Sequence, residues 1–141
     1  MGKFSAAEWM DAAAVFAGGC LGSLARHGVG LLIPDGGGIR FPWATFCVNL
    51  AGSLALGWLA GYAGRRAVPD WLKEGLGTGL LGGFTTFGAV GAQLWELLSA
   101  GAYGTAVAYG AGSAIGGFAL AWYGVRLGEN GMRSRKKGES S

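Results

Sequence analysis

Long apolar segments alternate with short polar ones along this chain, and their lengths predict helices that cross a membrane. A hydrocarbon core roughly 30 Å thick requires about 20 residues of helix. Four segments are long enough, at residues 12–33, 43–62, 71–99 and 102–123. The first ends at Pro34 and the second at Arg65-Arg66, whereas only Gly101 separates the third from the fourth. We therefore expect four helices, of which the last two form an antiparallel hairpin.

The third segment is too long for one straight, untilted helix, and its glycines and threonines lie at its centre. Gly82 and Gly83 precede Thr85 and Thr86 there, and Gly88 follows them. Irregular backbone at this depth is tolerated only where protein buries it or where it lines a water-filled path. We expect two half-helices that meet near residues 82–86, at an ion or substrate site. A kinked helix with glycines for close packing is the alternative.

Composition supports a polytopic membrane protein. Of the 141 residues, 51% are hydrophobic and 13% are charged, and the mean hydropathy of +0.38 is too high for a soluble domain of this size. The 30 glycines are spread through the apolar segments, where they allow close contact between helices. Lys3, Glu8 and Asp11 before the first segment do not form a cleavable signal pattern, so this segment is expected to remain.

The first segment places an arginine in a stripe of glycines. Gly18, Gly22, Arg26 and Gly30 are spaced four residues apart and share one helix face. A buried arginine is costly unless it meets carbonyl groups, a carboxylate or an anion, which favours a functional role. The alternative is that Arg26 extends its guanidinium toward the membrane surface near Pro34.

Polar residues form similar stripes on two other segments. The second segment carries Thr45, Asn49, Ser53, Gly57 and Gly61 on one face. The fourth carries Thr105, Tyr109, Ser113 and Gly117 beside a stripe of Gly104, Ala108, Gly112 and Gly116. Such donors either line a polar path or hold helices together by hydrogen bonds, and the pattern is compatible with both.

Other kinds of chemistry are missing from the predicted spans. No acidic residue lies at the middle of a span, so proton-coupled cation export lacks its usual carboxylate. Cys20 and Cys47 are expected to be small core residues rather than a disulfide, and His27 to have a packing or interfacial role. No phosphate-binding loop, catalytic triad or paired carboxylate occurs. We expect neither an enzyme nor a nucleic-acid partner.

Three motifs, in order along the chain, resemble those of the CrcB/Fluc fluoride channel family. They are Gly19-x-x-Gly22-Ser23-x-x-Arg26, Thr45-x-x-Val48-Asn49-x-x-Gly52-Ser53 and Gly82-Gly83-Phe84-Thr85-Thr86-Phe87. The resemblance covers residues 15–125, across all four predicted helices. It implies an all-α membrane protein that forms an antiparallel, dual-topology dimer of four-helix subunits. It also implies two fluoride pathways, passive efflux that lowers cytoplasmic fluoride, and a structural sodium ion at the dimer centre.

The resemblance assigns roles to individual residues. It implies that backbone carbonyls of Gly82 and Thr85 hold the sodium ion. The pathway residues that it implies are Asn49, Phe87, Tyr109, Ser113 and the family arginine, Arg26. Fluoride is small and strongly hydrated, so a pore must replace its water with donors such as an amide or the hydroxyl of Thr45. The electropositive edge of Phe87 can also face an anion.

The chain also departs from the family pattern. Family members usually continue the third motif as Ser-Thr-Phe, whereas this chain has Gly88-Ala89-Val90, and the family glutamate is Gln93 here. These differences favour a subunit that needs a partner to complete its pathway. Besides a fluoride channel subunit, a small four-helix transporter and a non-conducting partner subunit remain as alternatives.

The distribution of basic residues predicts an orientation. With four spans, nine Lys and Arg residues lie on the side of the two termini, and only Arg40 lies on the other side. The positive-inside rule puts both termini in the cytoplasm of a multi-pass protein of the cell membrane. An antiparallel homodimer needs the same chain inserted both ways, so we hypothesise pairing with an oppositely oriented paralogue, with the homodimer as the alternative. Residues 1–125 then form the channel subunit, and residues 126–141 a basic, disordered tail.

Overall fold

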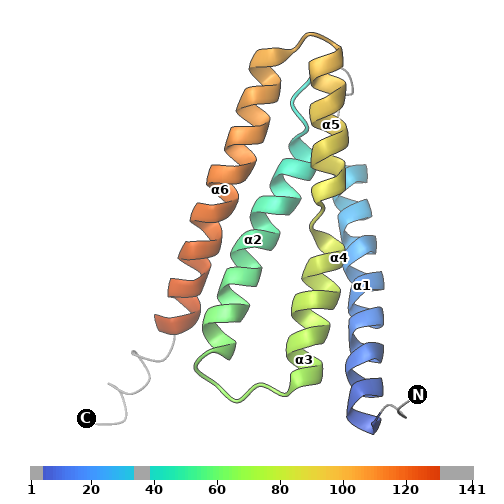
Figure 1. The fold of residues 1–141 in the computed structure, drawn as a ribbon, viewed down its shortest axis with the longest axis vertical. Coiled ribbons are helices and arrows are strands. Elements are labelled where there is room, and N and C mark those ends of the chain that lie inside the picture. The colour runs from blue at the N-terminus through green and yellow to red at the C-terminus, as the bar shows by residue number, and fades with distance from the viewer. Residues whose placement is uncertain (1–4, 34–38, 131–141) are drawn as a thin grey trace.

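The computed structural model describes residues 5–33 and 39–130, which are helical apart from short connections (Figure 1). No strand occurs in these two ranges. In chain order the helices are α1 (Ala6–Leu32), α2 (Trp43–Ala63), α3 (Asp70–Glu74), the π-helix η1 (Gly75–Leu81), α4 (Gly82–Phe84), α5 (Phe87–Ser99) and α6 (Tyr103–Asn130). Because α3, η1 and α4 follow one another directly, the described chain has four long segments, which confirms the predicted all-α class.

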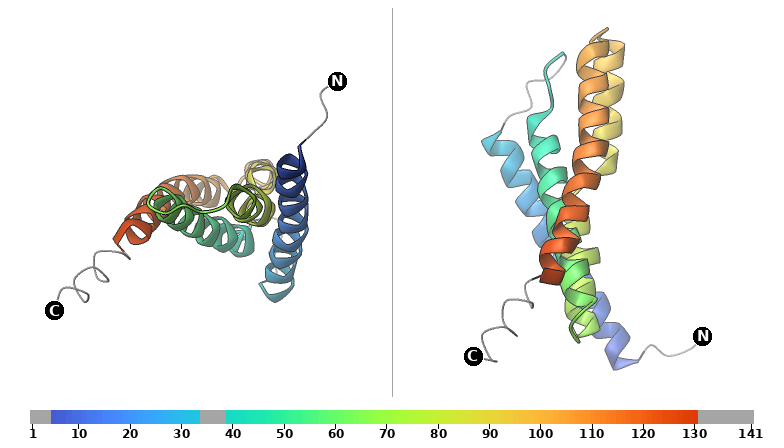
Figure 2. Two further views of the ribbon diagram at one scale, coloured as in Figure 1. Left: turned by 90° about the horizontal axis from the view of Figure 1, so that it is seen from below. Right: turned by 90° about the vertical axis from the view of Figure 1, so that its left-hand side faces the viewer.

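The segments lie side by side and run alternately up and down, with α1 at one edge and α6 at the other (Figure 1). One pair consists of α1 packed on α3, η1 and α4, and the other consists of α2 packed on α6. Helix α5 contacts α6 as well. The first turn of α1, the last turn of α6 and the loop at residues 64–69 lie at one end, as Figure 2 also shows.

Helix α1 begins where local hydrogen bonds, rather than hydropathy, set the boundary, and α6 is longer than hydropathy predicts. Helix α1 starts at Ala6, six residues before the predicted start, because Ser5 and Glu8 form a capping box. The Ser5 N–H donates to the Glu8 carboxylate at 2.6 Å, and the Glu8 N–H donates to Ser5 Oγ at 3.3 Å. Helix α6 continues to Asn130, so residues 126–130 of the predicted tail are helical rather than disordered. Residues 131–141 of the predicted tail lie outside the described residues.

The turn between α5 and α6 is a Schellman motif. Gly101 has a φ of 73°, a left-handed conformation that glycine adopts at little cost. The Ala102 N–H donates to the Leu97 carbonyl at 2.9 Å, and the Gly101 N–H donates to the Leu98 carbonyl at 3.1 Å. This geometry stops α5 and reverses the chain within three residues, which produces the predicted antiparallel hairpin.

Glycines bring α2 and α6 into backbone contact. A Cβ atom at Gly57 would overlap the Ala121 carbonyl oxygen, and one at Gly124 would overlap the Leu54 carbonyl oxygen. Gly61 and Gly128 make equivalent contacts one helical turn away. All four glycines are buried, so the small-residue part of the predicted α2 stripe is a packing surface.

Helix α1 packs on η1 and α4 in the same way. Gly18 and Gly22 leave no room for a Cβ atom against the backbone of Gly75 and Leu80. A Cβ atom at Gly79 would lie 2.7 Å from the Val15 carbonyl oxygen, so glycines on both sides make the contact possible. Nothing lies within 4 Å of a Cβ at Gly30. The predicted glycine stripe of α1 therefore serves packing only in its first half.

Helix lengths are compatible with a membrane protein. Helices α1 and α2 are long and apolar enough to cross a bilayer. Helix α6 has 28 residues, which corresponds to roughly 42 Å at a rise of about 1.5 Å per residue. Helix α5 has only 13 residues, so the third segment needs both of its halves to span a bilayer.

Candidate functional site

The third segment changes direction at two threonines. Helix α4 ends at Phe84, Thr85 is extended with φ −78° and ψ 158°, and Thr86 is extended with φ −150° and ψ 125°. The Thr85 side chain donates back to the Leu81 carbonyl at 2.9 Å, whereas Thr86 Oγ1 accepts the Ala89 N–H at 3.2 Å and caps α5. The pair thus ends one helix and starts the next.

Asn49 holds this connection from α2. Its Nδ2 donates to the Thr86 carbonyl at 3.0 Å, and its Oδ1 accepts the Thr86 N–H at 2.8 Å. Gly52, one turn along α2, has no room for a Cβ atom because the Thr85 side chain occupies that space. The buried backbone of the connection is therefore satisfied by a side chain 37 residues away in the sequence.

The two predicted sodium ligands both lose their usual helical donors. In an α-helix the Gly82 carbonyl would accept the Thr86 N–H, but that group donates to Asn49. The Thr85 carbonyl would accept the Ala89 N–H, but that group donates to Thr86 Oγ1. Gly82 is exposed on this subunit and Thr85 is half-buried. Two backbone oxygens near the bend are thus available to another donor or to a cation.

An open cleft of about 400 Å³ lies beside the connection, between α2, α5 and α6. Three of the predicted pathway residues line it together, namely Asn49, Phe87 and Ser113. Phe87 is 88% exposed, so its ring lies at the open side of the cleft. Ser113 Oγ is buried and has no hydrogen-bond partner within the described residues. A buried hydroxyl without a partner costs free energy and calls for an explanation.

A hydrogen-bond network lies one helical turn from this cleft. The Tyr109 hydroxyl donates to Gln93 Oε1 at 2.8 Å, and Gln93 Nε2 donates to Thr45 Oγ1 at 3.0 Å. Thr45 and Tyr109 each lie one turn from the cleft residues Asn49 and Ser113. Gln93 therefore ties α2, α5 and α6 together, a role that sequence analysis did not assign to it. Its position seven residues after Thr86, two turns along the same face, is the signal that could have indicated it.

Aromatic rings enclose the buried end of the network. Tyr109 is fully buried, and its ring centroid lies 5.5 Å from that of Phe41 and 6.5 Å from that of Phe46. Phe41 and Phe46 are themselves 5.1 Å apart in an edge-to-face arrangement. The phenol is thus fixed by packing on one side and by Gln93 on the other, so its direction is well defined.

Arg26 does not join this group. It lies on α1, is half-buried, and makes no hydrogen bond or ion pair with another described residue. It does not line the cleft. Within this chain, Arg26 is therefore separate from the other predicted pathway residues.

The basic residues near the shared end of the helices have local partners. Arg65 lies 3.6 Å from Glu129 and links the end of α2 to the end of α6. Arg66 donates to the Tyr62 hydroxyl at 3.1 Å and lies 4.9 Å from the ring centroid, and Arg126 lies 5.2 Å from the centroid of Trp122. Arginines and aromatic rings together are typical of a membrane–water interface.

Comparison with known proteins identifies relatives of this chain. The family described as "CrcB-like protein, Camphor Resistance (CrcB)" matches residues 13–125. "Fluoride-specific ion channel FluC 2" of Geobacillus kaustophilus is 38% identical over 112 residues, which cover 79% of this chain and 87% of that protein. "Fluoride-specific ion channel FluC" of Thermus thermophilus is 40% identical over 111 residues, which cover 79% of this chain and 89% of that protein.

The protein of the same name from Gloeobacter violaceus is 44% identical over 111 residues, which cover 78% of this chain and 89% of that protein. The matched region begins within α1, includes α2, α3, η1, α4 and α5, and ends within α6. Both the family match and these identities extend over most of the chain. The chain therefore belongs to the CrcB-like family.

Proposed function

We propose that this chain is a subunit of a fluoride-specific ion channel in the cell membrane. The relatives named above are fluoride-specific ion channels and match most of the chain. The observation that carries the proposal is the cleft in which Asn49, Phe87 and the unpartnered Ser113 hydroxyl meet. The activity is transport by passive efflux, not catalysis, and it lowers cytoplasmic fluoride.

The cleft supplies donors of the kind that a dehydrating anion requires. Ser113 has an O–H group that is not engaged by a described residue. Asn49, which lines the cleft, uses one amide hydrogen for Thr86, and its amide group carries a second one. The ring edge of Phe87 adds a weak electropositive surface. Several weak donors let an ion enter and leave, whereas one strong site would retain it.

The exposed side of the cleft supports a second subunit. Phe87 lines the cleft with 88% of its surface exposed, so a second subunit that covers the cleft would bury this ring. In the proposed assembly, an antiparallel partner covers the rim and completes each pathway. Arg26 then approaches a pathway through the assembly rather than within its own subunit.

A sodium ion fits the bend between α4 and α5. The Gly82 and Thr85 carbonyls have lost their usual helical donors, and sodium, a hard cation, prefers oxygen ligands. In the proposed dimer, these two oxygens from each subunit hold the ion at the centre. When bound, sodium supplies a fixed positive charge that favours an anion nearby.

The partner is either a second copy or an oppositely oriented paralogue. The basic residues Arg65 and Arg66 follow the end of α2, Lys73 lies in α3, and Arg126 lies near the end of α6. These parts of the chain lie at the end that carries the first turn of α1, which supports cytoplasmic termini. Val90 lines the cleft at a position where the family pattern has an aromatic residue. Both observations favour a heterodimer, in which this chain contributes an incomplete pathway.

Fluoride efflux from liposomes, measured with a fluoride electrode and without a proton gradient, tests the proposal. Purified chain, alone or with a second homologous subunit, should release fluoride once a potassium ionophore balances the charge. Efflux that requires a proton gradient would instead favour a coupled transporter. Absence of efflux from both preparations would contradict the channel proposal.

A topology reporter at the C-terminus separates the two dimers. One fixed cytoplasmic orientation, with fluoride resistance restored only by the second subunit, supports the heterodimer. A reporter on both sides of the membrane, with resistance from the single chain, supports the homodimer.

A further inference from the structure

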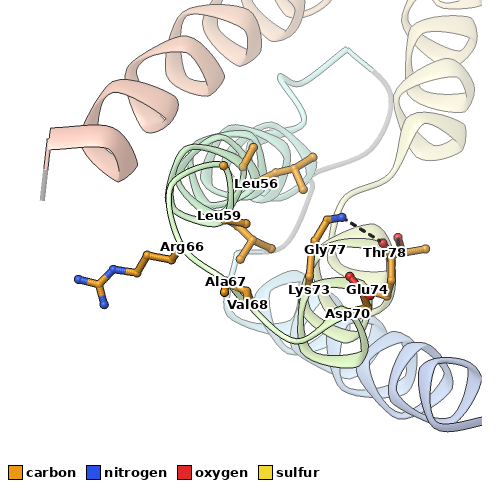
Figure 3. Close-up of a pocket in the computed structure, with 13 residues that line it drawn as sticks. Leu56, Leu59, Arg66, Ala67, Val68, Asp70, Lys73, Glu74, Gly77 and Thr78 are labelled. Atoms are coloured by element: carbon orange, nitrogen blue, oxygen red, sulfur yellow. Dashed lines mark hydrogen bonds and ion pairs between the residues drawn. The ribbon is translucent and has the colours of Figure 1, made fainter. Parts of the chain in front are cut away.

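A second hollow lies between the two helix pairs, beyond the cleft. It is a groove of about 710 Å³ between the last part of α2, the following loop, α3 and η1. Figure 3 shows Leu56 and Leu59 on the α2 wall, and Lys73, Glu74 and Thr78 on the opposite wall. The groove opens because α2 packs on α6 while α3 and η1 pack on α1.

The groove has a polar wall suited to water and ions. Thr78 Oγ1 donates to the Glu74 carboxylate at 2.7 Å, and Lys73 Nζ lies 3.9 Å from the same carboxylate. The Arg66 guanidinium extends away from the groove (Figure 3). Lys73 and Glu74 are both partly exposed, so charge in this groove is screened and hydrated.

Leu56 is shared by the groove and the cleft. It lines the groove together with Leu59 and Gly77, and it lines the cleft together with Asn49 and Ser53. A Cβ atom at Gly77 would lie 4.0 Å from a Leu56 methyl carbon and 3.5 Å from a Leu59 methyl carbon. The polar residues of the two hollows are therefore separated by an aliphatic side chain on α2 that faces a glycine on η1.

We propose that the groove is a water-filled entrance at the end that carries the termini, and that Leu56 forms an apolar constriction between this entrance and the donor-lined cleft. This inference rests on the proposed function. An apolar constriction resists wetting, so the passage of a strongly hydrated ion is slow there unless donors lie close on the far side. Asn49 lies seven residues from Leu56, two turns along the same face of α2. Leu56 thus limits the rate of entry and forces the ion to exchange water for donors within a short distance.

Substitutions at Leu56 separate wetting from size. Asparagine has the same branched shape and the same number of side-chain heavy atoms as leucine but is wetted, so Leu56→Asn should raise fluoride flux by about three-fold or more and weaken discrimination against chloride. Leu56→Phe should lower the flux by about ten-fold, because it narrows an already apolar passage. Leu98 offers matched controls, since its exposure of 45% is close to the 48% of Leu56 and it lines neither hollow.

The measurement is liposome efflux of fluoride and of chloride, in the assembly that passes fluoride in the assay above. Opposite effects of Leu56→Asn and Leu56→Phe, with Leu98→Asn and Leu98→Phe equal to wild type, support the constriction. If wild type and the Leu98 variants pass fluoride while the Leu56 variants match them, the constriction is wrong and the channel proposal stands. If wild type and all variants pass no fluoride, the channel proposal fails and the constriction fails with it.

Discussion

The side-chain amide of Asn49 pairs with the backbone of Thr86 through two hydrogen bonds, as the backbones of two neighbouring strand residues do. The amide donates to the Thr86 carbonyl at 3.0 Å and accepts the Thr86 N–H at 2.8 Å. This pair removes a helical donor from Gly82 and keeps the connection between α4 and α5 extended. Asn49 therefore acts as a positioning residue for the bend while it lines the cleft.

Asn49→Asp should reduce fluoride efflux by at least about ten-fold. Aspartate still accepts the Thr86 N–H but cannot donate to the Thr86 carbonyl, and two facing oxygens in a part-buried site cost about 1–3 kcal/mol. Its negative charge also repels an anion in the cleft. Liposome efflux and size-exclusion profiles of the assembly measure both effects. Asn130→Asp, the same change at the exposed end of α6, is the control, and efflux at the wild-type rate in Asn49→Asp would contradict the assignment.

Ser113→Ala should lower efflux without loss of stability. The Ser113 hydroxyl makes no hydrogen bond to a described residue, so its removal breaks no internal contact and relieves a buried polar group. A donor to an ion contributes about 1.5–3 kcal/mol, so the rate should fall by roughly ten-fold or more. Thermal unfolding in detergent and fluoride efflux from liposomes are measured for the variant and for the wild type. A less stable variant with unchanged efflux would show that Ser113 is a packing residue.

Gln93→Leu should destabilise the subunit by about 1–3 kcal/mol, because two part-buried hydrogen bonds of the Thr45–Gln93–Tyr109 network are lost. Tyr109→Phe removes one of the same bonds. The double variant should therefore lose less stability than the sum of the two single variants. Denaturant unfolding of the four proteins gives the coupling free energy, and strict additivity would argue against a shared network.

Gly124→Ala should weaken the packing of α2 on α6. A Cβ atom there would lie 2.8 Å from the Trp58 backbone nitrogen and would overlap the Leu54 carbonyl oxygen, and such overpacking costs about 1–3 kcal/mol. Gly104→Ala is the control on the same helix, since nothing lies within 4 Å of its Cβ position. The control should gain up to about 1 kcal/mol from helix propensity. Equal melting temperatures for the two variants would contradict the close contact.

Gly82→Leu should leave the subunit folded and impair the dimer. A Cβ atom at Gly82 would meet only the Gly77 carbonyl oxygen, at 3.8 Å, so the subunit itself accommodates a side chain. In the proposed dimer, however, a bulky residue beside the Gly82 carbonyl obstructs the sodium ion. Native mass measurement and sodium-dependent stability test this, with Thr85→Ser, which keeps the carbonyl and the hydroxyl, as the control. Unchanged assembly and sodium response in Gly82→Leu would rule out this site.

The sequence alone determined the fold class, the number of helical segments and the motifs that indicate the family. These follow from local properties: the length of apolar segments, the spacing of residues four apart, and the order of motifs along the chain. Gly57 and Gly61 are one example, since a small-residue pair at helical spacing predicts close packing before the neighbouring helix is known. Helix boundaries were less predictable. Hydropathy does not register the Ser5–Glu8 capping box, and it does not register the polar but helical continuation of α6 to Asn130.

Only the tertiary structure decided which polar residues meet. Thr45 and Gln93 are 48 residues apart in the sequence, and Asn49 and Thr86 are 37 apart, so no helical periodicity relates them. The same holds for Leu56, whose position between two hollows depends on the packing of α2 on α6 and of η1 on α1. Arg26 shows the converse, because the family resemblance implied a place among the pathway residues, yet within this chain it lies on α1 and does not line the cleft. Periodicity indicates which residues share a helix face, but the direction of that face depends on how close glycines allow the neighbouring helices to come.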